Sequence, residues 1–217
     1  MNITINLGQD TYISAEEILL VLYADTAPVK KLISDAKAND TLIDLRNRNN
    51  LKLRTVIVTK KNDIIISSLS ARGLCKRYND IVNKINTNPL TIHLLQPMIH
   101  IGFHNFIPMN NIYYFREVTS DSGQRITRNE KKTKNYYNIT QASKTRTRIV
   151  LTNGEFVLTS IYSASLKERL DEAVNCLSSK QPYYAVAKFK TEKNSLNDNE
   201  DDSEIEEFEF EELFEDE

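Results

Sequence analysis

The sequence predicts an α+β protein built from two tandem copies of one small module, followed by a disordered acidic tail. Each module is expected to hold a twisted antiparallel sheet and helices. Three observations predict this class. Short β-branched runs alternate with amphipathic stretches, the order of these elements repeats after about 94 residues, and acidic residues crowd the C-terminal end. We place the modules at residues 1–88 and 98–180, and the tail at 191–217.

The first copy contains six segments that favour extended structure. One of them, Thr41–Asp44, follows the first helix, which Asn39-Asp40 is expected to end. Ile3–Leu7 alternates apolar and polar residues, and Tyr12–Ser14 and Ile18–Tyr23 follow it. Thr55–Thr59 and Ile64–Ser67 are rich in β-branched residues, which favour strands. The four polar residues between these last two segments predict a hairpin.

Two amphipathic helices are predicted in the same copy. In Asp25–Asp44, Thr26 can cap the first turn and Pro28 falls where its missing N–H costs nothing. The apolar face of this helix holds Val29, Leu32, Ile33 and Ala36. Ser70 can cap the second helix, whose apolar stripe is Leu74, Tyr78, Ile81, Val82 and Ile85.

The same order begins again at residue 98. Ile99–Gly102 repeats Ile5–Gly8, Phe106–Pro108 repeats Tyr12–Ser14, and a second hairpin surrounds Asn153-Gly154. A last helix from Ser163 has the stripe Leu166, Leu170, Ala173, Val174 and Leu177. The copies differ in the middle: residues 117–148 are polar, basic and poor in apolar residues, and predict a long, mobile loop.

Several functional classes find no support. Cys75 and Cys176 stand too far apart in the sequence for a disulfide framework or a metal motif. His93, His100 and His104 lack partners at ligand spacing. No phosphate-binding glycine loop or nucleophile motif occurs. The N-terminus does not resemble a signal peptide, and the apolar run Ile18–Ala24 is too short to span a bilayer. We expect a cytoplasmic protein that is not an enzyme, with no cofactor and no metal.

The charge is distributed unevenly. Of 30 acidic residues, 14 lie from Glu192 onward, with only one of the 28 basic residues, Lys193. Residues 1–191 therefore hold 27 basic and 16 acidic residues, a net charge of +11. Such a body favours a polyanionic partner, because Lys and Arg displace counterions from phosphates.

The candidate phosphate-binding residues fall in both copies. In copy one they are Lys30, Lys31, Arg46, Arg48, Lys52, Arg54, Lys60 and Lys61. In copy two they are Arg125, Arg128, Lys131, Lys132, Lys134, Arg146 and Arg148. An ordinary solvated basic surface remains the alternative for any one of them.

Several spaced motifs resemble a bacterial family. Ile5-Asn6-Leu7-Gly8, Ile13-Ser14-Ala15, Thr26 to Lys31 and Leu42-Ile43-Asp44 resemble RemA, the regulator of extracellular-matrix genes. The match covers about residues 3–78. Copy two, from Met98 to Leu170, more nearly resembles the companion family RemB through Ile99–Gly102, Thr152-Asn153-Gly154 and Ser163 to Lys167.

The resemblance implies a fold similar to LytTR DNA-binding domains, assembly into homo-oligomeric rings, and direct binding of double-stranded DNA. It attributes DNA contacts to an early arginine and to an arginine-rich segment before the hairpin. In this chain the early arginine position holds Glu17 in copy one and Asn111 in copy two. In the later segment, copy one has Leu51 at one of the arginine positions, whereas copy two keeps Arg146-Thr147-Arg148.

Two functions follow as hypotheses. The first is a DNA-binding transcription regulator that uses the basic surfaces of both copies. The alternative is a non-catalytic scaffold subunit that has kept assembly but lost much of its DNA binding, as Glu17 and Leu51 suggest. The tail could compete with DNA for the basic body, dock its apolar side chains on another protein, or only solubilise the chain.

Overall fold

The computed structural model describes residues 3–7, 11–46, 51–86, 95–119, 121–132 and 135–185. Residues 1–187 form one compact unit that contains both copies. The acidic tail lies outside the described residues, so its predicted disorder stays a prediction.

The elements of the two copies follow the same order. In copy one they are β1 (Thr4–Asn6), β2 (Tyr12–Ser14), η1 (Ala15–Glu17), β3 (Ile18–Tyr23), α1 (Ala27–Ala38), β4 (Leu42–Asp44), β5 (Thr55–Thr59), β6 (Ile64–Ser67) and α2 (Ala71–Asn86). In copy two they are β7 (Met98–Gly102), β8 (Asn105–Pro108), η3 (Met109–Asn111), β9 (Ile112–Glu117), α3 (Asp121–Glu130), β10 (Tyr136–Asn138), β11 (Thr147–Leu151), β12 (Phe156–Thr159) and α4 (Ser163–Ser178).

The duplication is preserved in individual hydrogen bonds. The hydroxyl of Ser67 donates to the carbonyl of Leu7 at 3.2 Å, and that of Thr159 donates to the carbonyl of Ile101 at 2.6 Å. Backbone bonds repeat as well: Ala15 N–H donates to Ile3 O, and Met109 N–H donates to Pro97 O. The offset between the copies is 94 residues in the first part of the module and 92 from the hairpin onward, which confirms the predicted repeat.

The two predicted helices and the predicted hairpin of copy one are confirmed. Thr26 Oγ1 accepts from Val29 N–H at 3.4 Å, and Ser70 Oγ accepts from Gly73 N–H at 3.0 Å. Each bond satisfies one of the donors that a helix start leaves unpaired. The hairpin turn places Asn62 in the left-handed region at φ 66°, which Asn tolerates better than most residues.

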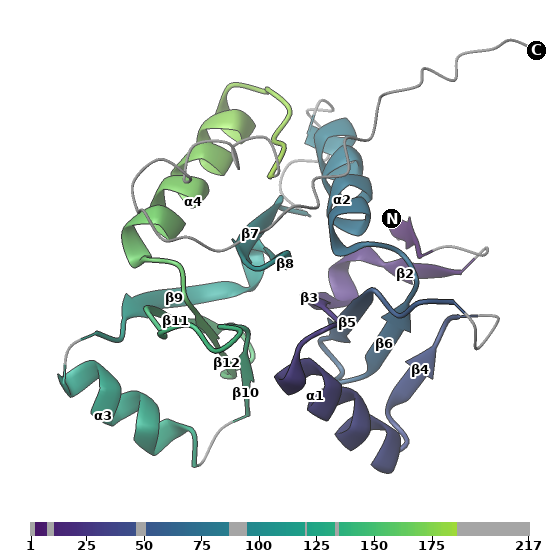
Figure 1. Cartoon of the computed structure of the whole chain (residues 1–217). Helices are drawn as coiled ribbons and strands as arrows, with labels where there is room; N and C mark the ends of the chain where they lie inside the picture. Colours follow the sequence, from purple (N-terminus) through teal and green to yellow (C-terminus); the bar gives the residue numbers. More distant parts are fainter. Residues whose placement is uncertain are drawn as a thin grey trace, which may run out of the picture. The chain divides into compact units, whose positions relative to one another are not determined.

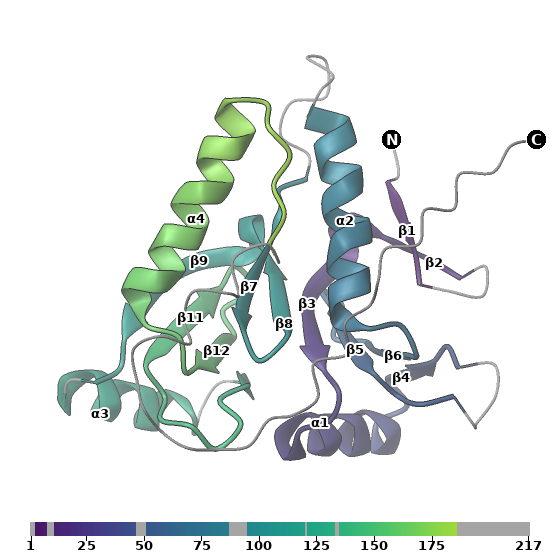
Figure 2. The ribbon, with the colours of Figure 1, turned by 45° about the horizontal axis from the view of Figure 1, so that its top comes forward.

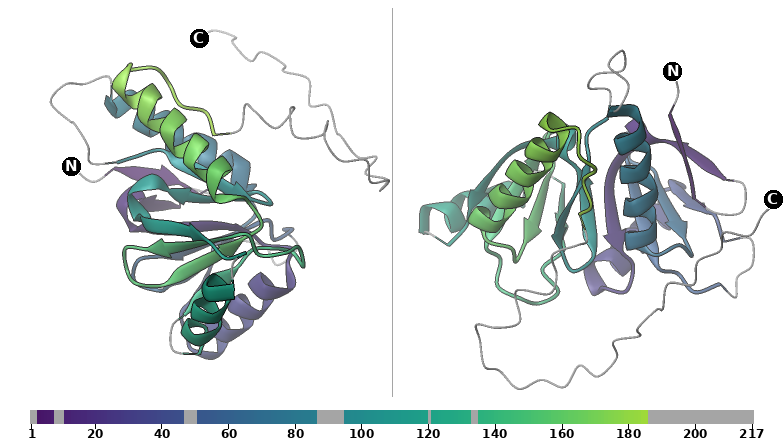
Figure 3. Two further views of the ribbon diagram at one scale, coloured as in Figure 1. Left: turned by 90° about the vertical axis from the view of Figure 1, so that its left-hand side faces the viewer. Right: turned by 90° about the horizontal axis from the view of Figure 1, so that it is seen from above.

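Helices cover both faces of the strands. Figures 1 and 3 show α2 and α4 on one side and α1 and α3 on the other. The main apolar core draws residues from both copies, including Leu22, Val56, Ile107 and Val157. A second core lies among α2, β1 and the neighbouring strands.

The strands of the two copies join in one sheet. Its order is β4-β6-β5-β3-β8-β7, so the β7–β8 hairpin of copy two extends the sheet of copy one (Figure 2). A second sheet has the order β10-β12-β11-β9, and β1 and β2 form a separate pair. In both copies a parallel pair, β4 with β6 and β10 with β12, completes an otherwise antiparallel arrangement.

The predicted mobile loop at residues 117–148 is wrong. The segment contains α3 and β10, the counterparts of α1 and β4. Helix α3 lacks an apolar stripe because Gly123, Thr127 and Glu130 occupy the positions that Val29, Ile33 and Ala36 hold in α1. Gly123 and Thr127 are buried all the same. In α4, Val174 is 48% exposed and is not part of the buried face that we predicted for it.

Candidate nucleic-acid interface

Basic side chains converge on a hollow of about 310 Å³ at the start of α2. Lys52 and Arg54 approach it from the segment before β5, Arg72 from the first turn of α2, and His104 from the β7–β8 turn. Tyr23, Asp25, Leu53, Ser70 and Ala71 complete the lining. Two of these basic residues, Lys52 and Arg54, were predicted from the sequence, whereas Arg72 and His104 were not.

The backbone of Arg54 is fixed by strand hydrogen bonds. Its N–H donates to Ser67 O at 3.1 Å, and its carbonyl accepts from Ala24 N–H at 3.1 Å. The side chain nevertheless remains exposed. A guanidinium held on a fixed backbone loses less freedom when it binds phosphate, and its planar fork can grip two phosphate oxygens.

Arg72 stands at an unusual place for a cation. It is the second residue of α2, where the aligned peptide dipoles present partial positive charge. A basic residue there adds its charge to the partial positive charge of the helix start. Arg72 and the start of α2 therefore favour the same kind of ligand, an anion seated in the hollow.

His104 brings copy two into the hollow. Its backbone adopts φ 57°, and its ring lies edge-on to Tyr23 with the ring centroids 6.0 Å apart. Partial burial, and secondly the positive charge of Arg72, lower the pKa of His104. The imidazole is therefore neutral at pH 7 and can gain a proton when a phosphate approaches.

One carboxylate also faces the hollow. Asp25 pairs with Lys30 Nζ at 2.6 Å, and the hydrogen bond from Lys30 is the main reason that the pKa of Asp25 lies below its usual value. The charge of Lys30 thus offsets that of Asp25. The lining of the hollow then holds three cationic side chains, Lys52, Arg54 and Arg72, and the single carboxylate of Asp25.

Copy two has counterparts of two of these basic residues, whereas Ala164 stands where copy one has Arg72. Arg146 corresponds to Arg54, since its N–H donates to Thr159 O as that of Arg54 donates to Ser67 O. Its guanidinium lies over the ring of Tyr162, 4.3 Å from the centroid, which holds the side chain in place. Lys144 stands where copy one has Lys52.

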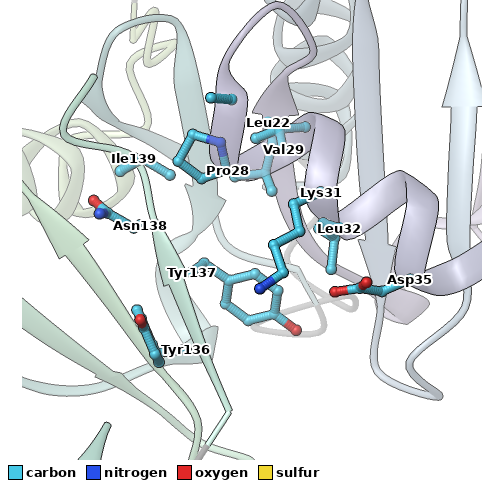
Figure 4. Close-up of a pocket in the computed structure, with 11 residues that line it drawn as sticks. Leu22, Pro28, Val29, Lys31, Leu32, Asp35, Tyr136, Tyr137, Asn138 and Ile139 are labelled. Carbon is cyan, nitrogen blue, oxygen red and sulfur yellow. The ribbon is translucent and has the colours of Figure 1, made fainter. Parts of the chain in front are cut away.

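The remaining candidates lie in several places. Arg46 is held by Asp44 through bonds of 2.9 Å and 2.6 Å, and this side-chain pairing raises the pKa of Arg46 and lowers that of Asp44. Lys31 points into a separate cleft of about 500 Å³ between α1 and β10 (Figure 4). Lys60 and Lys61 are exposed in the β5–β6 turn, with Lys61 3.9 Å from Glu17.

Helix α3 and its end carry a second exposed basic group. Its members are Arg125, Arg128, Lys131 and Lys132. Lys131 Nζ lies 5.3 Å from the centroid of the Tyr136 ring. These four cations are close together in sequence but are not part of the hollow at α2.

Arg148 is in the interior. Its side chain is 1% exposed, lies 2.6 Å from a Glu130 carboxylate oxygen and covers the ring of Phe156 at 4.6 Å. In this position its guanidinium cannot reach a phosphate. Arg48 and Lys134 lie outside the described residues.

A family model described as extracellular matrix regulatory protein A-like, or RemA-like, matches two segments of the chain, residues 4–78 and 98–170. The chain belongs to the RemA-like family. The matched segments agree with the two copies predicted from the sequence, and the same model covers both.

Curated relatives of this RemA-like chain are named as candidate regulatory proteins. One from Geobacillus thermodenitrificans is 32% identical over 73 residues, which cover 34% of this chain and 82% of the relative. One from Gloeothece citriformis is 30% identical over 80 residues, covering 37% and 86%. Family and relatives support a regulatory role.

At the position where the resemblance implies an early DNA-binding arginine, copy two has Asn111, which makes a structural contact instead. Asn111 is buried and donates from Nδ2 to the carbonyls of Ile18 and Leu19 at 2.8 Å and 3.1 Å. It therefore clamps copy two to copy one. Its counterpart Glu17 lies at the end of η1.

Two further findings concern the described part of the chain. No group of three His, Cys, Asp or Glu side chains there could hold a metal ion. None of the helices described there has the length and apolar character needed to cross a membrane.

Proposed function

We propose that this RemA-like chain is a transcription regulator that binds double-stranded DNA, without catalytic activity. The convergence of Lys52, Arg54, Arg72 and His104 on the hollow at α2 carries the proposal. Three cations and a helix start in one concave place suit a backbone phosphate, which such groups bind through charge and directed N–H donors.

In copy two, the segment before the hairpin of β11 and β12 offers a second phosphate contact. Arg146 occupies the position of Arg54 and is steadied by Tyr162. The exposed cations of α3 would add further charge. Arg148 is left out of the proposed interface because it is buried against Glu130. We also propose a homo-oligomer, as the family resemblance implies, and a protein partner for the acidic tail stays a prediction.

Charge reversal tests the proposal. Arg54→Glu and Arg146→Glu, made in the full chain, should each weaken binding of a labelled random-sequence duplex at least tenfold at low salt, and together abolish it. Lys180→Glu, an exposed lysine after α4, is the matched control and should change affinity little. Fluorescence anisotropy gives the affinities. Equal effects of all three reversals would show that the contact is diffuse charge only.

The scaffold alternative rests on particular residues. Glu17, Leu51 and the buried Arg148 all occupy positions that the resemblance assigns to DNA-binding arginines. Under this alternative, the Arg54→Glu and Arg146→Glu chain would keep its full regulatory effect in cells. Under the DNA-binding proposal it would lose that effect although it folds normally by circular dichroism.

A further inference from the structure

The two copies meet along a strand pair inside the chain. Phe106 of β8 stands opposite Val21 of β3 in antiparallel register. Asn105 Oδ1 accepts from Tyr23 N–H at 2.8 Å, on the side of β3 that faces β8. Asn111 closes the junction through its two bonds to the carbonyls of Ile18 and Leu19.

The duplication produces the same two surfaces a second time. Strand β9 is the counterpart of β3, and it is an edge strand in the sheet that the described residues form. Strand β2 is the counterpart of β8, and in the described residues it pairs only with β1. An open edge exposes a row of backbone donors and acceptors that can pair with another strand.

The exposed side chains on these surfaces have buried counterparts. Tyr113 of β9 is 73% exposed, whereas Leu19, at the same place in β3, is 0% exposed. Tyr12 of β2 is 58% exposed, and its counterpart Phe106 is 0% exposed. Tyr113 and Tyr12 therefore occupy positions whose counterparts, Leu19 and Phe106, are buried at the junction between β3 and β8.

The same contrast between a covered residue in one copy and an exposed counterpart in the other holds for α1 and β10. Leu32 of α1 and Tyr137 of β10 face each other across the cleft of Figure 4 and pack against the core. Their counterparts, Ile126 of α3 and Ile43 of β4, are exposed by 39% and 43%. Exposed apolar groups thus occur at both the strand and the helix positions of the junction.

We propose that β9 of one chain pairs with β2 of a second copy, repeating between chains the junction that β3 and β8 form within one. This deepens the proposed homo-oligomer by naming its surfaces. The contact is head-to-tail, since it joins two different surfaces, and it continues from chain to chain until the rotation closes it. The second copy is the occupant because its hairpin is the homologue of the one already seated on β3.

The contact between chains is weaker than the one within a chain. Glu17 stands where Asn111 donates to two carbonyls. A carboxylate cannot donate, so Glu17 would face the backbone of Ile112 and Tyr113 as an acceptor. The association should therefore depend on concentration, and Glu17→Asn should strengthen it by supplying the missing donors.

The molar mass of the full chain, measured by light scattering, tests the inference. Because no DNA is present, the result does not depend on DNA binding. The wild type should exceed the 25.0 kDa of one chain. Tyr113→Lys and Tyr12→Lys should each reduce the mass to one chain. Tyr184→Lys, a control at another exposed tyrosine, should not. Glu17→Asn should lower the dissociation concentration at least threefold.

Mixing the two variants identifies the geometry. Tyr12→Lys leaves β9 intact and Tyr113→Lys leaves the hairpin intact, so an equal mixture should form a dimer with one junction and stop there. A wild type that stays monomeric at all concentrations overturns the inference. A mixture that stays monomeric, or association that survives both variants, overturns these surfaces even if the chain is oligomeric.

Discussion

At the scale of single residues, the buried pair of Arg148 and Glu130 shows how copy two differs from copy one. The corresponding residues of copy one are the apolar Val56 and Ala36, which lie in the main core. Copy two joins its helix to its sheet through an ion pair at the same place. Removing one partner leaves a desolvated charge without compensation.

We expect Glu130→Gln to lower the free energy of unfolding by about 2–3 kcal/mol, less than the full penalty of a buried pair because Glu130 keeps 22% side-chain exposure. The double variant Arg148→Val with Glu130→Ala installs the pair of copy one and should recover most of the loss. Urea unfolding at pH 7 measures both. Additive losses in the double variant would contradict the coupling.

His104 gives the proposed interface a pH dependence. Its pKa lies below the ordinary value because of burial and, secondly, the charge of Arg72. A phosphate in the hollow favours the protonated ring, so DNA affinity should rise as pH falls from 7.5 to 5.5, by up to about tenfold for each unit that binding raises the pKa. Anisotropy at several pH values measures this.

His104→Asn is the control for this prediction, because Asn tolerates the left-handed backbone at position 104. This variant should bind with little change over the same pH range. His100 does not compete as an explanation, since burial lowers its pKa to about 3 and keeps it neutral. An equal pH response in His104→Asn would assign the effect to other groups.

At the scale of elements, local patterns predicted most of the fold. Caps and apolar stripes predicted α1, α2 and α4, and β-branched runs predicted the two hairpins. Helix α3 was missed because its inward positions are glycine, threonine and glutamate, which give no apolar period. The glutamate is stabilised by an arginine 18 residues away, and a local pattern cannot reveal that partner.

The candidate site was predicted in part for the same reason. Lys52 and Arg54 belong to one basic run that the sequence displays. Arg72 and His104 come from a helix start and from the other copy, so only the fold brings them together. Arg146 stands just before β11 and Arg148 lies within it, and only Arg148 is buried, against Glu130 at the end of α3. The spacing of the two arginines in the sequence does not reveal this difference.

At the scale of the whole molecule, the two copies form one unit rather than separate bodies. The main core and the six-stranded sheet contain residues of both copies. This arrangement places His104 of copy two beside the cations of copy one, so the proposed DNA site depends on the junction between the copies. The boundaries at residues 88 and 98 remain predictions from the sequence.

The dependence of duplex binding on salt tests the central claim most directly. Each phosphate contact adds about 0.9 to the slope of log affinity against log salt concentration. We predict a steep slope for the full chain, reduced by about one in Arg54→Ala and again in Arg146→Ala, and unchanged in Lys180→Ala. No duplex binding at low salt, or a slope that neither arginine alters, would contradict DNA recognition through these sites.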